Sequence, residues 1–388
     1  MTTPAAPLAA AAAFAPAVPV LLAWFDAEGR DLPWRRRRTL YGTWIAEMML
    51  QQTTVAAVVP YWERFLARFP DVAALAAADE AEVLALWSGL GYYRRARLLH
   101  AAARRVVDGH GGRLPVDRAG WADLPGVGEY AAGAIASQGL GEPVPALDAN
   151  ARRVLVRWAA GEPAAAAALG PAALRSLAAA LVPVARPGAW NEALMELGAT
   201  VCRARDPRCG ACPVAAWCRA GRSGRAAEVP PARPRPQTVP VAVAMAVVRR
   251  GDEVLLLPPG RGPVAAPAAW GTAARDDLTG LHRGLWGMPT TAWFPAPAAA
   301  GPWRDEALAL WRRWAGAALA GPAVAAGSIT HGITRYRLAV EVVGLPVRIG
   351  CAAADLGVGD AVWTSWPTDL PVSKLVRKVV ARESHGSG

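Results

Sequence analysis

The stretch LPGVGEYAAGAIASQGLGEPVPALDAN, Leu124–Asn150, decides the fold of the first half of this chain. It begins with a glycine-containing turn, Gly126–Gly128, which leads into an alanine-rich helical run. It ends at Asp148 and Asn150, where the next helical run begins. Backbone N–H groups at such a turn and helix start can bind a phosphate. A Gly-x-Gly turn alone is weak evidence, so its interpretation depends on the rest of the chain.

The overall charge favours a polyanionic partner. The chain has 388 residues, a formal net charge of +11 and a pI of about 10.2. Nucleic acid is the first partner to consider, although a high net charge can also serve only to keep a protein soluble. Lys374 and Lys378 are the two lysines of the sequence, and all other basic side chains, histidines aside, are arginines.

The N-terminal sequence and the cysteines predict a cytoplasmic protein. No basic region precedes the Ala- and Pro-rich start, so a signal peptide is not expected, and no segment is apolar enough to span a membrane. Four of the five cysteines fall within Cys202–Cys218. This clustering favours a metal site over a disulfide framework and fits a reducing compartment.

Composition and periodicity divide the chain into four parts. Residues 1–17 form an Ala/Pro-rich extension that we expect to be disordered. Residues 18–220 show helical periodicity without strand alternation, and residues 221–240 form a Pro/Arg-rich linker. Residues 241–384 carry strand signals and two helical runs, which predict an α+β domain of about 150 residues.

Individual elements follow from the same patterns. In the first half, the predicted helices are Val18–Ala27, Tyr41–Val58, Pro60–Phe69, Glu80–Leu86, Arg94–Asp108, Glu129–Gln138, Ala149–Ala159, Ala172–Leu181 and Asn191–Val201. In the second half, a hairpin turns at Gly251-Asp252, further strands cover Gly327–Ile329, Tyr336–Val343 and Asp360–Trp366, and helices cover Arg304–Leu319 and Lys374–Arg382.

Four cysteines follow a helical run with the spacing C-x6-C-x2-C-x5-C. They are Cys202, Cys209, Cys212 and Cys218. Four thiolates in one short loop suit a tetrahedral zinc ion or a [4Fe–4S] cluster, and the spacing alone does not choose between them. Cys351 stands apart and is expected in a core.

Two carboxylates could serve an acid-catalysed reaction. Glu47 lies among Ile45, Met48 and Met49, and apolar surroundings raise the pKa of a carboxyl group. A raised pKa keeps a general acid protonated near neutral pH. The simpler interpretations are an exposed glutamate and, for Asp148, an ordinary helix N-cap. Together the two would be suitable equipment for cleaving a glycosidic bond.

Two basic-aromatic segments could contact nucleic acid. Leu90–Arg95 places two tyrosines beside two arginines in a glycine-containing turn, and Arg30–Arg38 combines Trp34 with a run of arginines. Aromatic side chains can stack on bases while arginines hold phosphates. Tyrosines in loops also commonly pack on a neighbouring helix, and a charge run is commonly a solvated surface.

With these motifs the first half resembles the helix-hairpin-helix, iron–sulfur DNA glycosylases. RDLPWR, EMMLQQT, WSGLGYYRRAR and NEALMELGA are similar to the MutY-type adenine DNA glycosylases, and the resemblance covers Val20–Arg219. It implies a [4Fe–4S] cluster rather than zinc. Val241–Leu257 and Gly284–Pro289 look like that family's Nudix-like 8-oxoguanine recognition domain, without the glutamate-rich motif of a Nudix hydrolase.

The resemblance implies a base-excision repair enzyme, which flips adenine out of A:8-oxoguanine or A:G mispairs in double-stranded DNA and hydrolyses its N-glycosyl bond as a monomer. By residue, it implies Glu47 as general acid and Asp148 as the carboxylate that stabilises the oxocarbenium-like sugar. It implies Tyr130 and Asn150 as residues that support this aspartate and the reacting sugar. It implies DNA phosphate contacts by Gly126, Val127 and Gly128, and substrate contacts by Arg30, Trp34, Arg35, Gln52, Thr53, Leu90, Tyr92, Glu192 and Thr334. The family usually has Phe-Ser-His where this chain has Ile333-Thr334-Arg335, so the resemblance does not fix how a lesion is read.

Three alternatives stay open. An endonuclease III-like enzyme also cuts the strand, but its Schiff-base chemistry needs a lysine where this chain has Tyr130. A thymine-mismatch glycosylase shares much of the first half but lacks the second domain. A non-catalytic damage-binding or redox-signalling iron–sulfur protein would not need Glu47 or Asp148. We therefore expect a monofunctional adenine glycosylase.

Overall fold

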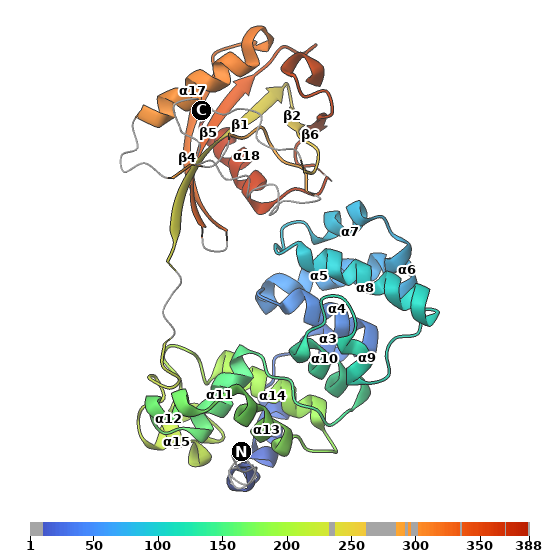
Figure 1. The fold of residues 1–388 in the computed structure, drawn as a ribbon, viewed down its shortest axis with the longest axis vertical. Helices are drawn as coiled ribbons and strands as arrows, with labels where there is room; N and C mark the ends of the chain where they lie inside the picture. Colours follow the sequence, from blue (N-terminus) through green and yellow to red (C-terminus); the bar gives the residue numbers. More distant parts are fainter. Residues whose placement is uncertain are drawn as a thin grey trace. The chain divides into compact units, whose positions relative to one another are not determined.

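The chain forms two compact units in the computed structural model (Figure 1). The structure describes residues 11–232, 237–260, 285–291, 294–295, 302–333, 336–368 and 370–386. The first unit contains Met1–Ala78 and Arg94–Pro234, and the second contains Asp79–Tyr93 and Arg235–Gly388. Within the described residues, no helix combines the length and the apolar character that a membrane crossing requires.

The first unit is helical. Its main helices are α2 (Ala17–Glu28), α3 (Pro33–Arg36), α4 (Leu40–Leu50), α5 (Val55–Arg68), α6 (Val72–Ala77), α8 (Arg94–His110), α9 (Arg118–Ala122), α10 (Glu129–Ile135), α11 (Ala149–Ala159), α12 (Pro163–Ala168), α13 (Pro171–Leu181), α14 (Pro187–Thr200) and α15 (Arg219–Arg222). A π-helix, Ala136–Leu140, continues α10. The predicted all-α character of this part is confirmed.

The glycine turn joins α9 to α10 and forms a helical hairpin. Gly126 has a positive φ of 81°, and a Cβ there would lie 2.8 Å from the Leu98 side chain and 3.0 Å from Met48. Glycine is therefore required both by the backbone conformation and by the space. Gly128 is the N-cap residue of α10, and Val127 is buried.

The predicted helix Tyr41–Val58 is wrong, because the chain breaks between α4 and α5. Gln52 adopts a positive φ of 59°, which ends helical geometry there. The buried Arg95 guanidinium holds this turn by donating hydrogen bonds to the carbonyls of Met48 (3.2 Å) and Met49 (2.6 Å) and to Thr53 Oγ1 (2.9 Å). Arg95 therefore supports the fold, although the sequence suggested a phosphate contact.

Helices α11 and α14 cross closely in a core that also includes α2 and α13. Gly198 makes this crossing tight, since a Cβ there would lie 2.6 Å from Asn150 Cβ and 3.0 Å from Asn150 Cα. The buried Asn191 of α14 holds the loop before α11: its Oδ1 accepts from the Ala146 N–H, and its Nδ2 donates to Val144 O and Ser137 Oγ. Both contacts fix the start of α11.

The second unit contains a mixed sheet between two helices. Its strands are β1 (Val239–Arg250), β2 (Glu253–Leu256), β3 (Phe294–Pro295), β4 (Val324–Ile333), β5 (Tyr336–Pro346) and β6 (Val362–Ser365). The sheet order is β4-β5-β1-β2-β6; β1 and β5 are parallel, and the other neighbours are antiparallel. The predicted hairpin and α+β class are confirmed.

Strand β1 supplies both faces of this sheet, so it is buried on both sides. Val241, Val243, Met245 and Val247 face α18 (Lys374–Gly386), whereas Ala244, Ala246 and Val248 face α17 (Pro302–Ala315). The two helices cover opposite faces of the sheet (Figure 1). Alternate side chains along this one strand thus pack against opposite helices, which gives a helix–sheet–helix sandwich.

Two details differ from the continuous 18–220 region and the 221–240 linker expected from the sequence. The segment around α7 (Glu80–Trp87) belongs to the second unit, where Ser88 Oγ and Tyr93 Oη donate to the Val372 carbonyl at 2.9 and 3.1 Å. The first part of the expected linker packs on the first unit, because Val229 is buried and its carbonyl accepts a hydrogen bond from Arg157 Nε. Thr334, Arg335 and most of the 1–17 extension lie outside the described residues.

Replacing Gly198 by alanine should destabilise the first unit by about 1–3 kcal/mol, because the added Cβ must push α11 and α14 apart. Urea denaturation measures this change. Gly109→Ala is the matched control, since Gly109 lies in α8 with no atom within 4 Å of the added Cβ, and it should be neutral or stabilising by up to about 1 kcal/mol. Equal behaviour of the two variants would contradict the close crossing.

Candidate active site

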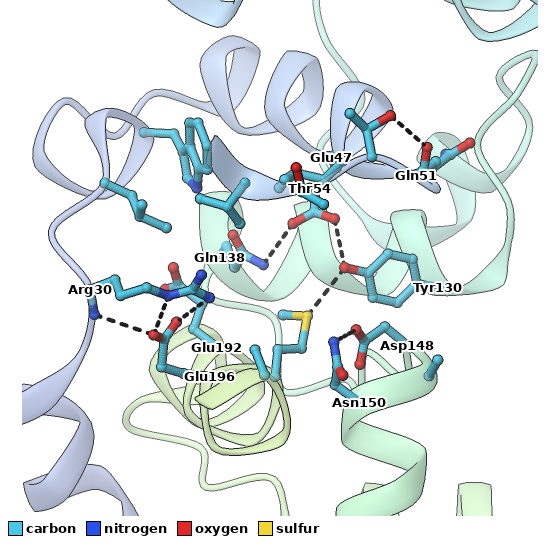
Figure 2. Close-up of a pocket in the computed structure, with 18 of the residues that line it drawn as sticks. Arg30, Glu47, Gln51, Thr54, Tyr130, Gln138, Asp148, Asn150, Glu192 and Glu196 are labelled. Atoms are coloured by element: carbon cyan, nitrogen blue, oxygen red, sulfur yellow. Dashed lines mark hydrogen bonds and ion pairs between the residues drawn. The ribbon is translucent and has the colours of Figure 1, made fainter. Parts of the chain in front are cut away.

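A cavity of about 800 Å³ opens in the first unit and collects many of the residues singled out in the sequence (Figure 2). Its walls come from segments that lie far apart in the chain. They include Arg30, Trp34, Arg35, Glu47, Gln52, Thr53, Tyr130, Gln138, Asp148, Asn150, Glu192, Met195 and Glu196.

Glu47 is buried at the cavity wall, with 5% of its surface exposed. Tyr130 Oη donates a hydrogen bond to its Oε2 at 2.8 Å, and Gln138 Nε2 donates to its Oε1 at 3.2 Å (Figure 2). Burial raises the pKa of Glu47 to about 7, against the two hydrogen bonds, and the charges of Glu192 and Asp148 raise it further. An exposed glutamate, the simpler interpretation, is excluded by this burial.

Tyr130 has two partners for its hydroxyl group. Besides Glu47 Oε2, the hydroxyl lies 3.2 Å from Met195 Sδ, a weak acceptor. The hydroxyl can therefore donate to the ionised carboxylate, or donate to sulfur and accept from the protonated carboxyl group. Burial, followed by the charge of Glu47, raises the pKa of Tyr130 above its usual value of 10, so the phenol stays neutral.

Asp148 is the N-cap residue of α11 and also lines the cavity. Its Oδ1 accepts from the Ala151 N–H at 2.6 Å, and its Oδ2 accepts from Asn150 Nδ2 at 2.9 Å (Figure 2). Arg153 Nη2 in turn donates to Asn150 Oδ1 at 2.8 Å, which orients the amide. Burial raises the pKa of Asp148 despite these hydrogen bonds. The helix-cap interpretation is therefore correct, and it leaves the carboxylate at the cavity.

Arginines and glutamates form an ionic network on one wall. Arg35 bridges Glu192 Oε1 and Glu196 Oε2, each at 3.0 Å, while Arg30 Nε lies 2.5 Å from Glu196 Oε1. Arg38 Nη2 lies 2.7 Å from Glu192 Oε2. Because both glutamates are buried, each needs its cationic partners, and the network fixes this wall of the cavity.

Other predicted contact residues lie in turns or outside the cavity. Gln52 lines the cavity and Thr53 Oγ1 is held by Arg95. Tyr92 is 52% exposed with a positive φ of 52°, and Leu90 is buried, both in the second unit. Gln52 and Tyr92 are thus both non-glycine residues with a positive φ, a strained conformation that is common in functional loops. Trp34 packs edge-on against Trp62.

Sequence reasoning missed several residues that shape the site. Gln138 contacts Glu47, Met195 contacts Tyr130, and Glu196 anchors Arg30 and Arg35. Met195 and Glu196 lie inside the quoted motif NEALMELGA, so the motif signalled them, whereas nothing in the sequence distinguishes Gln138.

The four clustered cysteines line one small cavity together with Arg157. Arg157 Nη1 donates to Cys202 Sγ at 3.2 Å, and the Gly221 N–H donates to Cys218 Sγ at 3.3 Å. Burial raises the pKa of Cys212 to about 11, so a thiolate there requires a positive centre beside it. Soft thiolate donors around one cavity, with N–H groups aimed at sulfur, fit a thiolate-bound metal centre.

These cysteines do not converge on a single point. Within the ranges that the structure describes, no group of three or more His, Cys, Asp or Glu side chains is placed to hold one metal ion.

Comparisons with known proteins agree with this geometry. Residues 45–177 match the family model described as HhH-GPD superfamily base excision DNA repair protein. The human adenine DNA glycosylase is 36% identical over 84% of this chain, which spans 66% of that protein, and the rat enzyme is 34% identical over 95% of this chain, which spans 78% of that protein. The adenine DNA glycosylase of Mycolicibacterium smegmatis is 44% identical over 52% of this chain and 69% of its own length.

Among solved structures, a thermostable thymine-DNA glycosylase matches with a TM-score of 0.51 and 29% identity, covering 54% of this chain and 97% of its own. The match to the rat enzyme includes both units of this chain, since it extends over nearly the whole sequence. The chain therefore belongs to the adenine DNA glycosylase family, within the HhH-GPD superfamily of base excision DNA repair proteins.

Proposed function

We propose that this chain is a DNA glycosylase that removes adenine from A:8-oxoguanine and A:G mispairs in double-stranded DNA. The observation that carries the proposal is Glu47, a buried carboxyl group with a pKa raised to about 7 at the wall of a cavity that also contains Asp148. A base inside a duplex cannot reach such a cavity, so adenine must rotate out of the stack.

Glu47 donates its proton to a ring nitrogen of adenine. The bond between C1′ of the sugar and the base then breaks, and its electron pair leaves with the protonated adenine. The sugar becomes an oxocarbenium-like cation, which a water molecule attacks. This water then loses a proton to solvent. Both partners of Glu47 are donors to its carboxylate, so they also stabilise the ionised group once its proton has left.

Asp148 stabilises the positive sugar. The N-terminus of α11 places the Asp148 carboxylate at the cavity, and Asn150 holds one of its oxygens. Arg153, behind Asn150, keeps the amide nitrogen turned towards Asp148. Tyr130 and Asn150 therefore act as support for the two carboxylates in this proposal.

The remaining predicted contacts surround the base and the DNA. Arg35 and Glu192 form the wall that meets adenine, with Arg30 and Trp34 beside it. Gln52, Thr53 and the exposed Tyr92 contact the duplex, whereas Leu90 is buried and has no such contact in this proposal. Gly126 and Gly128 offer their N–H groups to a phosphate, whereas the Val127 N–H donates to the Leu124 carbonyl. The second unit, with its mixed sheet between two helices, serves in this proposal as a Nudix-like domain that reads 8-oxoguanine.

We expect one chemical step only. A strand-cutting lyase forms a Schiff base through an amine, and the sequence offers Lys374 and Lys378, both in the second unit. Tyr130 stands where such a lysine would be required. The product should therefore be an intact strand with an abasic site.

A [4Fe–4S] cluster bound by Cys202, Cys209, Cys212 and Cys218 fits the cysteine cavity. When bound, the cluster would hold the four thiolates of the Cys202–Cys218 loop together, beside Arg157 of α11. Arg157 stabilises this loop also without a cluster, because its guanidinium group donates hydrogen bonds to the Arg203 and Val229 carbonyls.

Adenine release should be lost in Glu47→Gln and Asp148→Asn. Each should lower single-turnover adenine release from an A:8-oxoguanine duplex by at least about 100-fold, the low end for general acid catalysis. A glutamine side chain has nearly the size and shape of the glutamate it replaces, and asparagine is a good N-cap residue, so folding and duplex binding should persist. A wild-type chain that releases no adenine from A:8-oxoguanine, or that prefers a T:G duplex, would overturn the proposal.

The wild-type rate should depend on pH in a bell-shaped manner. Above about pH 7 the rate should fall because Glu47 loses its proton, and on the acid side it should fall because Asp148, whose pKa is raised, becomes protonated. Single-turnover rates from pH 4 to 9 measure both limbs. A rate that continues to rise through pH 8 would exclude Glu47 as the acid.

Stability provides an independent measure of the pKa of Glu47. Its folded pKa of about 7 exceeds the ordinary value of 4.5, so the penalty for ionising the buried group is absent below pH 4.5 and complete above pH 7. Glu47→Gln should therefore be more stable than wild type at pH 8, on the order of 3 kcal/mol, with little difference at pH 4.5. Glu63→Gln, at a half-exposed glutamate of α5, should show no such pH-dependent gain.

Purified protein should contain iron and acid-labile sulfide and show visible absorbance, which zinc lacks. The Cys212→Ser variant should lose the iron, the sulfide and the visible absorbance, and its first unit should have a lower thermal stability. Stoichiometric zinc without iron in protein purified anaerobically would refute the cluster.

A further inference from the structure

A second cavity, of about 250 Å³, lies behind the wall of the candidate active site. Tyr130 and Leu147 line both cavities, so one layer of side chains separates them. Its other lining residues are Arg118, Glu129, Pro145, Arg152 and Arg175. Three arginines from three separate helices, α9, α11 and α13, thus meet beside the glycine hairpin and the start of α11.

The guanidinium groups of these three arginines make no hydrogen bond to another described residue. Arg118 donates only through its backbone N–H, to Glu142 Oε2, and its buried Nε lacks a partner. Other arginines near the active site differ: Arg35, Arg95 and Arg153 each donate several hydrogen bonds to protein oxygens. The second cavity therefore contains guanidinium donors that no described protein acceptor uses.

Among the described residues that line this cavity, Glu129 supplies the single carboxylate. Its Oε1 lies 3.9 Å from Arg118 Nη2 and 3.6 Å from Arg175 Nε, both too long for hydrogen bonds. Its side chain is 62% exposed, so it can turn into solvent at little cost. The carboxylate reduces the repulsion among three cations without saturating their donors.

The chemistry of this cavity fits a phosphate group. Arginine forks match the geometry of phosphate oxygens, and the volume is small for a base with its sugar. We propose that Arg118, Arg152 and Arg175 bind a phosphodiester of the DNA strand that carries the excised adenine, and that Glu129 occupies its place in the free protein. This proposal rests on the DNA-binding part of the function proposed above and adds a phosphate contact beyond the glycine hairpin.

Salt dependence of binding tests the proposal. Affinity for an A:8-oxoguanine duplex is measured by fluorescence anisotropy at several salt concentrations, with Glu47→Gln as the parent so that no base is released. Adding Arg175→Ala should reduce the slope of log affinity against log salt by about 0.9, which corresponds to one phosphate contact. Arg175→Lys should recover the slope in part, because it keeps the charge without the fork. Glu129→Gln should tighten binding.

Two comparisons make the outcome decisive. Arg105→Ala removes an exposed arginine of α8, and a loss of slope equal to that of Arg175→Ala would show a general charge effect and overturn the proposal. Ethylation of single phosphates near the target adenine should weaken binding by the parent at one position and leave Arg175→Ala unaffected there. Equal sensitivity of both proteins at every position would also overturn it. Neither result depends on adenine release, so this proposal and the enzymatic one can fail separately.

Discussion

The buried carboxyl group of Glu47 is the constraint on which the rest of the first unit depends. A carboxylate with almost no exposed surface is costly unless donors meet it, and here the donors come from the residues that follow the glycine hairpin. Tyr130 lies in the first turn of α10, and Gln138 lies in the π-helix that continues this helix. The π-helix, a geometry common at functional sites, continues α10 and carries Gln138 to Glu47. The segment that follows the glycine turn thus supplies both hydrogen-bond donors of the Glu47 carboxyl group.

Asp148 satisfies a second constraint because it has two tasks at once. One oxygen caps α11, and the other is held by Asn150 at the cavity. The position of this residue therefore depends on where α11 begins, and that point is fixed from α14: Asn191 holds the preceding loop and Gly198 allows the close crossing. The fixed start of α11 and the Asn150 amide together keep the Asp148 carboxylate in place.

The sequence allowed the helical first part, the cysteine loop, the hairpin and the α+β second part to be predicted, because each has a local signal such as glycine position, periodicity or spacing. It could not reveal that Gln138 contacts Glu47 or that Arg95 holds the α4–α5 turn, since both contacts join residues at least 40 positions apart. The prediction of one helix over Tyr41–Val58 was wrong for the same reason. Local propensity favours a continuous helix, but the distant Arg95 stabilises the turn between α4 and α5. Likewise, Asp79–Tyr93 joins the second unit through contacts with Val372 that no local pattern contains.

The arginine-rich composition acquires a chemical meaning beside this site. Of the 42 lysine and arginine residues, two are lysines, and both lie on α18 of the second unit. Arginine stays protonated and cannot form a Schiff base, whereas a lysine amine near an abasic sugar can do so. A chain that binds DNA through guanidinium groups can therefore hold a reactive product closely without an amine beside it. In the first unit, the basic side chains, histidines aside, are all arginines, so this unit carries its positive charge without a lysine amine.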